Sequence, residues 1–265
     1  MKRVFVFTLV AFYIFSFYSC SSNLAPVGHF QSTAIVADGN TDDWQLPLRF
    51  SNAEYTYMYS VTNDNKNIYI CILSKDADEQ LRILRSGISI YFDAKDKKNK
   101  TTILEFPVKK PIESNYDYNS SSNTVDRRTR VNQLLLESNY YNTTGFTNIE
   151  NGQFDISNTT TGIQTAIKLN NDNALVYEAI IPLNDIPGVV LTGKKAGKNF
   201  GVGIVVNPSG AGSQPHNNSS FRPSFGMRGM RMGMNRGGGQ RNQQHNEEIN
   251  WYDFRLATTN GNGQP

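Results

Sequence analysis

The alternation of apolar and polar positions along the chain predicts a protein built mainly from β-strands. In the segment Ile163–Lys168, isoleucine or threonine alternates with Gln164, Ala166 and Lys168. A period of two places successive side chains on opposite faces of a sheet. The segment therefore fits an antiparallel strand with one buried face and one exposed face.

Other segments have the composition of strands and the spacing of turns. Tyr55–Val61 and Ile68–Leu73 are rich in aromatic and β-branched residues, and the turn-forming cluster Asn63–Asn67 separates them. This order predicts a β-hairpin. Further strands are predicted at Thr33–Val36, Ile88–Asp93, Thr102–Val108, Gly162–Leu169, Ala174–Ile181, Phe200–Val206 and Ile249–Leu256.

Helix is expected in one place, Asp76–Ser86, where Asp76 or Asp78 can cap the first turn and Gly87 can end the last. Residues 109–160 are rich in Asn, Ser, Thr and Tyr, and they predict a long connection with one or two short strands, such as Val131–Glu137. Many strands with one short helix predict an all-β sandwich and not a doubly wound sheet.

The first twenty residues have the pattern of an export signal. A basic start is followed by the nearly uniform apolar run Val4–Phe17. That run is shorter than the ~20 residues a membrane-spanning helix needs. Ser19 then precedes Cys20, as in a bacterial lipobox, in which the cysteine is lipidated and becomes the first residue. Ordinary secretory cleavage and a retained anchor are the alternatives.

We expect a signal peptide at 1–19, a lipidated cysteine with a tether at 20–28, one sandwich domain at 29–257 and a flexible tail at 258–265. Residues 207–247 are expected to form a disordered insertion between the last two strands. This segment holds four of the six methionines of the chain, with arginines and glycines around them. Contact with an anionic surface and metal binding by its thioethers are alternative roles.

Composition excludes several classes of function. The chain has 265 residues and a net charge of only +3, which does not favour nucleic acid as a partner. Two cysteines exclude a disulfide framework and a four-cysteine zinc site. Cys71 lies in an apolar strand, so we expect it to be a buried hydrophobic residue.

The sequence contains no recognisable catalytic motif, so we predict that the protein is not an enzyme. It lacks a Gly-x-Ser-x-Gly elbow, and His29, His216 and His245 lie near the tether or the insertion. The acidic clusters Asp42–Asp43 and Asp76–Glu79 suit turns and helix capping, and calcium binding is the alternative for each. No metal site is assigned.

Aromatic residues suggest a carbohydrate ligand, because sugar rings present C–H faces that stack on flat side chains. The chain has 13 Tyr, 15 Phe and 2 Trp, and many asparagines for the sugar hydroxyl groups. Trp44 is expected to plug one end of the core. The candidate ligand-binding residues are Trp251, Tyr252, Tyr140 and Tyr141, with Tyr116 and Tyr118 as further exposed rings.

Several short motifs, taken in order, resemble the carbohydrate-binding module family 9-like domains. Asp38–Trp44 fits the opening D-G-x-x-D-D-W, and Asn63–Ile70 fits the N-D … N-L-Y-I hairpin. Gly87–Asp93 fits a G-x-x-x-x-x-D strand, and Tyr177–Leu183 fits Y-E-x-x-I-P-L. The likeness is closest to the versions on lipoproteins of Bacteroidota-type bacteria.

The resemblance implies an immunoglobulin-like or jelly-roll sandwich that binds sugar without catalysis. Related DOMON domains bind haem or sugar, but Met58 is the only methionine of the expected domain outside the insertion, which disfavours haem. The implied location is the bacterial outer membrane, with the periplasmic side slightly favoured because Ser21–Asn23 lacks acidic residues. The alternative function is an envelope scaffold that contacts a protein partner through the sandwich and the Arg-rich insertion.

Overall fold

The computed structural model describes residues 25–95, 97–109, 126–158, 160–190, 198–208 and 249–258. The expected signal peptide, Cys20, most of the tether, the insertion beyond residue 208 and the tail beyond residue 258 lie outside these residues. So do Tyr116 and Tyr118.

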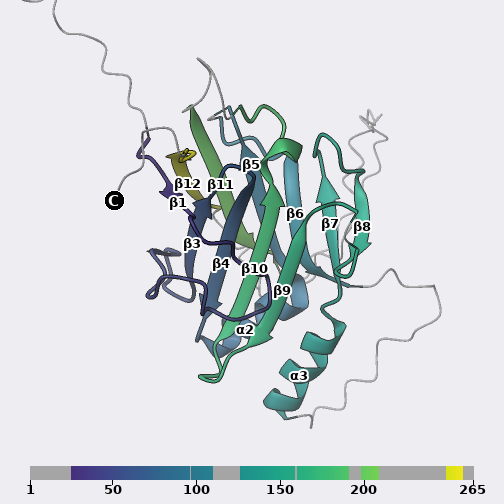
Figure 1. Ribbon diagram of the computed structural model, residues 1–265. Coiled ribbons are helices and arrows are strands. Elements are labelled where there is room, and N and C mark those ends of the chain that lie inside the picture. Colours follow the sequence, from purple (N-terminus) through teal and green to yellow (C-terminus); the bar gives the residue numbers. More distant parts are fainter. Residues whose placement is uncertain are drawn as a thin grey trace, which may run out of the picture.

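Two six-stranded sheets stack face to face in the described part of the chain (Figure 1). The front sheet has the order β1-β3-β4-β10-β9, with β2 paired to β3, and the back sheet has the order β12-β11-β5-β6-β7-β8. Apart from the short parallel pair β1–β3, neighbouring strands are antiparallel. The predicted all-β sandwich is therefore confirmed.

The front sheet consists of β1 (His29–Phe30), β2 (Phe50–Ser51), β3 (Met58–Asn63), β4 (Asn67–Ser74), β9 (Gln164–Leu169) and β10 (Leu175–Pro182). The back sheet consists of β5 (Ile88–Asp93), β6 (Thr102–Val108), β7 (Tyr140–Thr144), β8 (Gly152–Asp155), β11 (Asn199–Val206) and β12 (Asn250–Arg255). The predicted hairpin is β3–β4, and β5 and β6 have the predicted bounds.

The main core lies between the sheets and is made by the alternate side chains that each strand turns inward. Phe106 of β6 and Tyr177 of β10 meet there with ring centroids 5.5 Å apart. Isoleucines such as Ile70 and Ile90 are fully buried beside them. Each such side chain contributes about 1.5–3 kcal/mol of transfer free energy.

A second, smaller core covers the outer face of the front sheet. Ile35, Trp44 and Leu48 pack there against strand residues such as Val176 and the fully buried Cys71. Cys71 is thus the buried hydrophobic residue that the sequence predicts. Trp44 is buried as expected, but it belongs to this second core and not to one end of the main one.

The predicted strand Thr33–Val36 is wrong, because this segment has no strand pairing in the structure. Its position explains the error. Ile35 is needed to cover the front sheet, whereas Val36 remains 57% exposed and donates its N–H to Asp43 Oδ2. Apolar composition here reflects burial against a sheet and not membership in one.

In the described ranges, two α-helices lie at one end of the sandwich (Figure 1). Helix α2 (Ala77–Ser86) is the predicted one, and Asp76 Oδ1 caps it by accepting from the N–H groups of Asp78 and Glu79. Helix α3 (Arg127–Glu137) replaces the strand predicted at Val131–Glu137, so the expectation of a single helix is wrong.

The amphipathic spacing of α3 accounts for that difference. Its buried residues Val131 and Leu134, with the partly buried Leu135, follow the i, i+3, i+4 spacing of one helix face. Arg127 of α3 also pairs with Asp78 of α2 at 2.7 Å. A short 3₁₀ turn, η1 (Leu183–Asp185), follows β10.

Residues at both expected segment boundaries are built into the fold. Pro26 and Gly28, expected in the tether, exchange backbone hydrogen bonds with Arg255 of β12. Asn207, expected at the start of the insertion, donates its backbone N–H to the Gly87 carbonyl and its side-chain amide to the Ser86 carbonyl. The ordered domain therefore begins before residue 29 and continues past residue 206.

Candidate carbohydrate-binding face and edge groove

The two candidate rings of β12 lie on opposite faces of the back sheet. Tyr252 points inward, where its ring stacks on Phe254 at a centroid distance of 4.9 Å and contacts Phe50 at 4.4 Å. Trp251 points outward and contacts Tyr91, with centroids 6.3 Å apart. The ring of Tyr252 is engaged by core neighbours, so of these two rings Trp251 is the one that can offer a stacking surface on the outer face.

The tyrosines of β7 divide in the same way. Tyr141 has no exposed surface, stacks on Phe154 and forms a 2.6 Å hydrogen bond with Thr161. The prediction that Tyr141 is an exposed ligand-binding ring is therefore wrong, because strand alternation places it in the core. Tyr140 is partly exposed and lies on the outer face, as Trp251 does.

Strand register places Trp251 in an aromatic row that crosses the outer face of the back sheet. Trp251 of β12 is opposite Gly203 of β11, Gly203 is opposite Tyr91 of β5, and Tyr91 is opposite Ile103 of β6. We call these residues the aromatic row. They give the outer face a partly exposed apolar strip.

Glycines in β11 provide the space for the indole ring of Trp251. A Cβ atom on Gly203 would lie 3.0 Å from Trp251 Cε2, and one on Gly201 would lie 3.3 Å from Trp251 Cε3. These contacts are tighter than normal carbon packing. Because neither glycine has a side chain, the ring lies close against the β11 backbone, which fixes its orientation.

A polar row runs beside the aromatic row, two positions away from it on β5 and β6, and continues onto β7 and β8. Ser89 is opposite Glu105, Glu105 is opposite Asn142, and Asn142 is opposite Gln153. Asn142 Nδ2 donates to Glu105 Oε2 at 3.2 Å, and Ser89 Oγ donates to Asn207 Oδ1 at 2.7 Å. The row thus presents amide and carboxylate groups in fixed positions, whereas the hydroxyl group of Ser89 is buried.

In this row, the side-chain carbonyl oxygen of Gln153 has no hydrogen-bond partner among the described residues. Its Nε2 donates to the Lys109 carbonyl at 2.9 Å, which fixes the amide. Its Oε1 is buried and accepts no hydrogen bond from the residues that the structure describes. A buried acceptor left in this state is costly, and a ligand hydroxyl group would satisfy it.

Tyr91 of the aromatic row interacts with Ser89 and Glu105 of the polar row. Burial raises the pKa of its phenol, the nearby Glu105 charge raises it further, and the hydrogen bond with Ser89 acts in the opposite direction. The phenol therefore stays neutral at physiological pH. A neutral hydroxyl group at the edge of an aromatic ring can both donate and accept hydrogen bonds.

Acidic side chains border the other side of the aromatic row. Asp93 of β5 and Asp253 of β12 both lie opposite Gly201. Lys98 Nζ is 3.9 Å from Asp253 Oδ2. Asp93 is buried and accepts from the N–H groups of Lys95, Lys97 and Asn99, so it organises the turn that follows β5.

The opening motif has a structural role at the front sheet. Glu178 of β10 is 1% exposed, and it accepts from Trp44 Nε1 at 2.7 Å, Gly39 N at 2.6 Å and Asp38 N at 3.0 Å. Gly39 adopts a φ of 81° and packs on the stem of Lys168. The aspartate-glycine turn and Trp44 are thereby fastened to the sheet by one carboxyl group.

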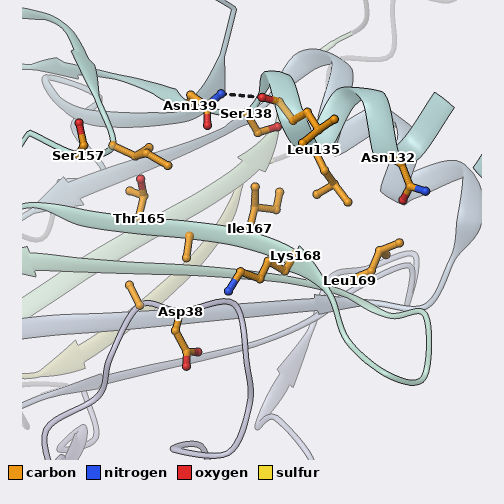
Figure 2. A pocket seen from close by; sticks show the side chains of 14 residues that line it. Asp38, Asn132, Leu135, Ser138, Asn139, Ser157, Thr165, Ile167, Lys168 and Leu169 are labelled. Atoms are coloured by element: carbon orange, nitrogen blue, oxygen red, sulfur yellow. Dashed lines mark hydrogen bonds between the residues drawn. The ribbon is translucent and has the colours of Figure 1, made fainter. Parts of the chain in front are cut away.

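A separate groove of about 870 Å³ lies along β9, the free edge of the front sheet. Figure 2 shows Thr165 and Ile167 on one side of the strand, with Leu135 of α3 above them, and Lys168 on the other side near Asp38. We call this the edge groove. None of its described lining residues is aromatic, so this lining lacks the stacking surface of the outer face.

Within the described ranges, no three His, Cys, Asp or Glu side chains are grouped closely enough to hold a metal ion. The same residues include no helix that is long and apolar enough to cross a membrane.

Comparison of the chain with family models, with curated proteins and with solved structures finds no match. The likeness to family 9-like modules therefore remains a prediction based on the short motifs.

Sequence reasoning named Trp251 and Tyr140 as candidate rings, which the structure places on the outer face, but it missed the residues around them. Tyr91, Glu105 and Gln153 come from separate strands, and only the register of the back sheet brings them together. Two signals were present in the sequence: Gly201 and Gly203 interrupt a β-branched strand, and Tyr91 and Glu105 have the alternation of outward positions. Glycine inside a strand often marks such close approach.

Proposed function

We propose that this chain is a non-catalytic carbohydrate-binding module whose ligand lies across the outer face of the back sheet. The observation that carries the proposal is the outward indole of Trp251, which lies against Gly203 and beside Tyr91. Flat rings at such a position stack on the C–H face of a sugar. The polar row lies next to them for the hydroxyl groups.

Charge on the outer face supports a neutral sugar over an anionic one. Glu105 and Asp253 lie on or beside the two rows, and Lys98 is the basic side chain paired with Asp253. Carboxylates so placed repel an acidic polysaccharide and accept hydrogen bonds from hydroxyl groups. The affinity for a single sugar unit is expected to be weak, because little area is buried.

Substitution of the indole tests this proposal directly. Glycan-array screening of the purified chain should identify a ligand, and titration calorimetry should show that Trp251→Ala weakens its binding about tenfold or more. Trp251→Phe keeps a flat ring and should retain part of the affinity. Gly203→Ala should also weaken binding, because the new methyl group would lie 2.8 Å from Ile249 Cγ2 and 3.0 Å from Trp251 Cε2, so that both side chains would have to move.

Tyr55→Ala is the matched control, because Tyr55 is 83% exposed and lies outside both rows. Equal binding by Trp251→Ala and the unchanged chain would contradict the proposed site. Absence of any glycan signal from the intact chain would contradict the proposed function.

We further propose that the module is a bacterial outer-membrane lipoprotein anchored through Cys20, with its domain on the periplasmic side. The alternative role is an envelope scaffold that contacts a protein partner. It is supported by the edge groove, whose described lining has no aromatic ring for a sugar.

A further inference from the structure

Strand β9 leaves one row of backbone groups without a strand partner. Among the strands that the structure describes, it pairs with β10 alone and ends the order of the front sheet. At the turn, Asn170 N donates to the Ala174 carbonyl, so these two residues form a hydrogen-bonded pair. Hydrogen-bonded and non-hydrogen-bonded pairs alternate along an antiparallel ladder. Leu169, Ile167 and Thr165 therefore belong to the non-hydrogen-bonded pairs with β10. The N–H and C=O groups of Thr165, Ile167 and Leu169 therefore point away from β10, toward the edge groove.

Two walls flank this free edge. Asn132, Leu135 and Leu136 of α3 form one wall together with residues 156–157, and Ala37 and Asp38 form the other. Figure 2 shows the strand running between them. The backbone edge thus lies at the floor of a groove and not at the outermost limit of the molecule.

Exposed apolar side chains border the edge groove. Leu136 is 78% exposed and Ile156 is 36% exposed, and both line it. Exposed apolar groups next to an unpaired strand edge are usually avoided, because they promote association. Their presence here indicates a surface that a partner covers.

Thr165 provides an independent sign of a missing ligand. The residue is only 7% exposed and lines the groove, and its Oγ1 has no hydrogen-bond partner among the residues that the structure describes. A buried hydroxyl group in this state favours a ligand that carries donors and acceptors.

The shape of the groove selects a single strand as its occupant. A second folded copy would have to bring its own β9 edge between the two walls, where its α3 and its residues 37–38 would meet those of the first. A lone extended segment has no such flanking structure. Its backbone would complete the ladder, as in strand addition to other sheet edges.

We infer that the edge groove binds an extended segment of another polypeptide, which adds to the front sheet as a strand beside β9. Its alternate apolar side chains pack on Leu135, Ile167 and Leu136, and its backbone pairs with Thr165, Ile167 and Leu169. Lys168 and Asp38 contribute one charge of each sign. The groove therefore selects a segment in which apolar and polar side chains alternate, and not a segment with a net charge.

Fluorescence-anisotropy titration of the purified chain with labelled heptapeptides tests the inference. The panel alternates valine, leucine or isoleucine with serine, and each member has a matched copy with N-methylated backbone nitrogens. At least one unmodified peptide is expected to bind saturably, and its N-methylated copy at least tenfold more weakly. Equal binding of both copies, or no binding by any member, would overturn the inference.

Variants of the chain locate the binding. Thr165→Pro removes an outward N–H and should abolish binding, whereas Thr165→Val keeps that N–H, loses only the hydroxyl group and should bind with an affinity between that of Thr165→Pro and that of the unchanged chain. Leu136→Glu should weaken binding, whereas Leu46→Glu, at a 55% exposed residue outside the groove, should not. If Thr165→Pro fails to fold by circular dichroism, the leucine pair decides.

Unchanged binding by Leu136→Glu would overturn the groove as the site. Dimerisation of the intact chain in sedimentation, lost in Leu136→Glu, would overturn the peptide in favour of a second copy. Glycan binding by Trp251 is measured separately and is not altered by either result.

Discussion

Buried carboxyl groups have distinct tasks in this molecule, and Glu178 is the clearest case at the scale of single residues. It holds the Asp38–Gly39 turn and Trp44 through three hydrogen bonds. Burial raises the pKa of Glu178, while the Trp44, Gly39 and Asp38 N–H donors act against that rise. Its contribution to stability is thus greatest below the ordinary glutamate pKa and declines as pH rises through the folded value.

Glu178→Ala is expected to lower the free energy of unfolding by about 2–4 kcal/mol, because it leaves three buried donors without an acceptor. Glu178→Gln keeps one carbonyl oxygen and should lose less. Urea denaturation followed by tryptophan fluorescence measures both. Similar stability of Glu178→Ala and the unchanged chain would show that the turn is held by packing alone.

Individual strands and turns could be predicted from the sequence where the signal is local. Alternation and turn residues located β5 and β6, and Asp76 located the start of α2. Helix α3 was missed because its apolar residues stand in a stretch rich in Asn, Ser and Thr, where a short strand fitted equally well. The rows of the outer face could not be predicted, because they depend on pairing between distant strands.

The turn after β5 is an element with its own pH dependence. Burial alone would raise the pKa of Asp93, but the backbone N–H groups of Asn99, Lys95, Lys97 and Lys98 outweigh it, and the pKa is lowered. The stabilisation is therefore present above the ordinary value of 3.8 and is lost as pH falls through the folded value.

Asp93→Asn should destabilise the chain by about 1–2 kcal/mol near pH 7, and this difference should shrink toward about pH 2–3. Chemical denaturation at both pH values measures it. Asp42→Asn, at an exposed position, is the control and should show little change at either pH. A difference for Asp93→Asn that is independent of pH would assign its role to packing.

At the scale of the whole molecule, the sandwich separates two surfaces of different chemistry. The outer face of the back sheet offers rings, amides and carboxylates, whereas the edge groove offers backbone groups and aliphatic side chains. Stacking favours a sugar on the first, and strand pairing favours a polypeptide on the second. The two proposed ligands need not compete.

The proposed lipid anchor also belongs to this scale. In a bacterial host fed an alkyne-tagged fatty acid, the intact chain should be labelled and Cys20→Ser should not, because the cysteine is the acceptor of the lipid. Cys71→Ala is the control and should keep the label, since Cys71 is fully buried. Labelling of Cys20→Ser would contradict a lipid at this cysteine.

The hydrogen bonds that join Pro26 and Gly28 to Arg255 set the reach of the module. From Cys20 to Ala25 the chain spans at most about 18 Å, and from Arg255 to Trp251 along β12 is about 14 Å more. With lipid on Cys20, the stacking ring would stay within a few tens of ångströms of the bilayer. Such a short tether would restrict the protein to glycans close to the membrane surface. Lengthening residues 21–24 would let Trp251 reach glycans farther from the bilayer without altering its affinity for them.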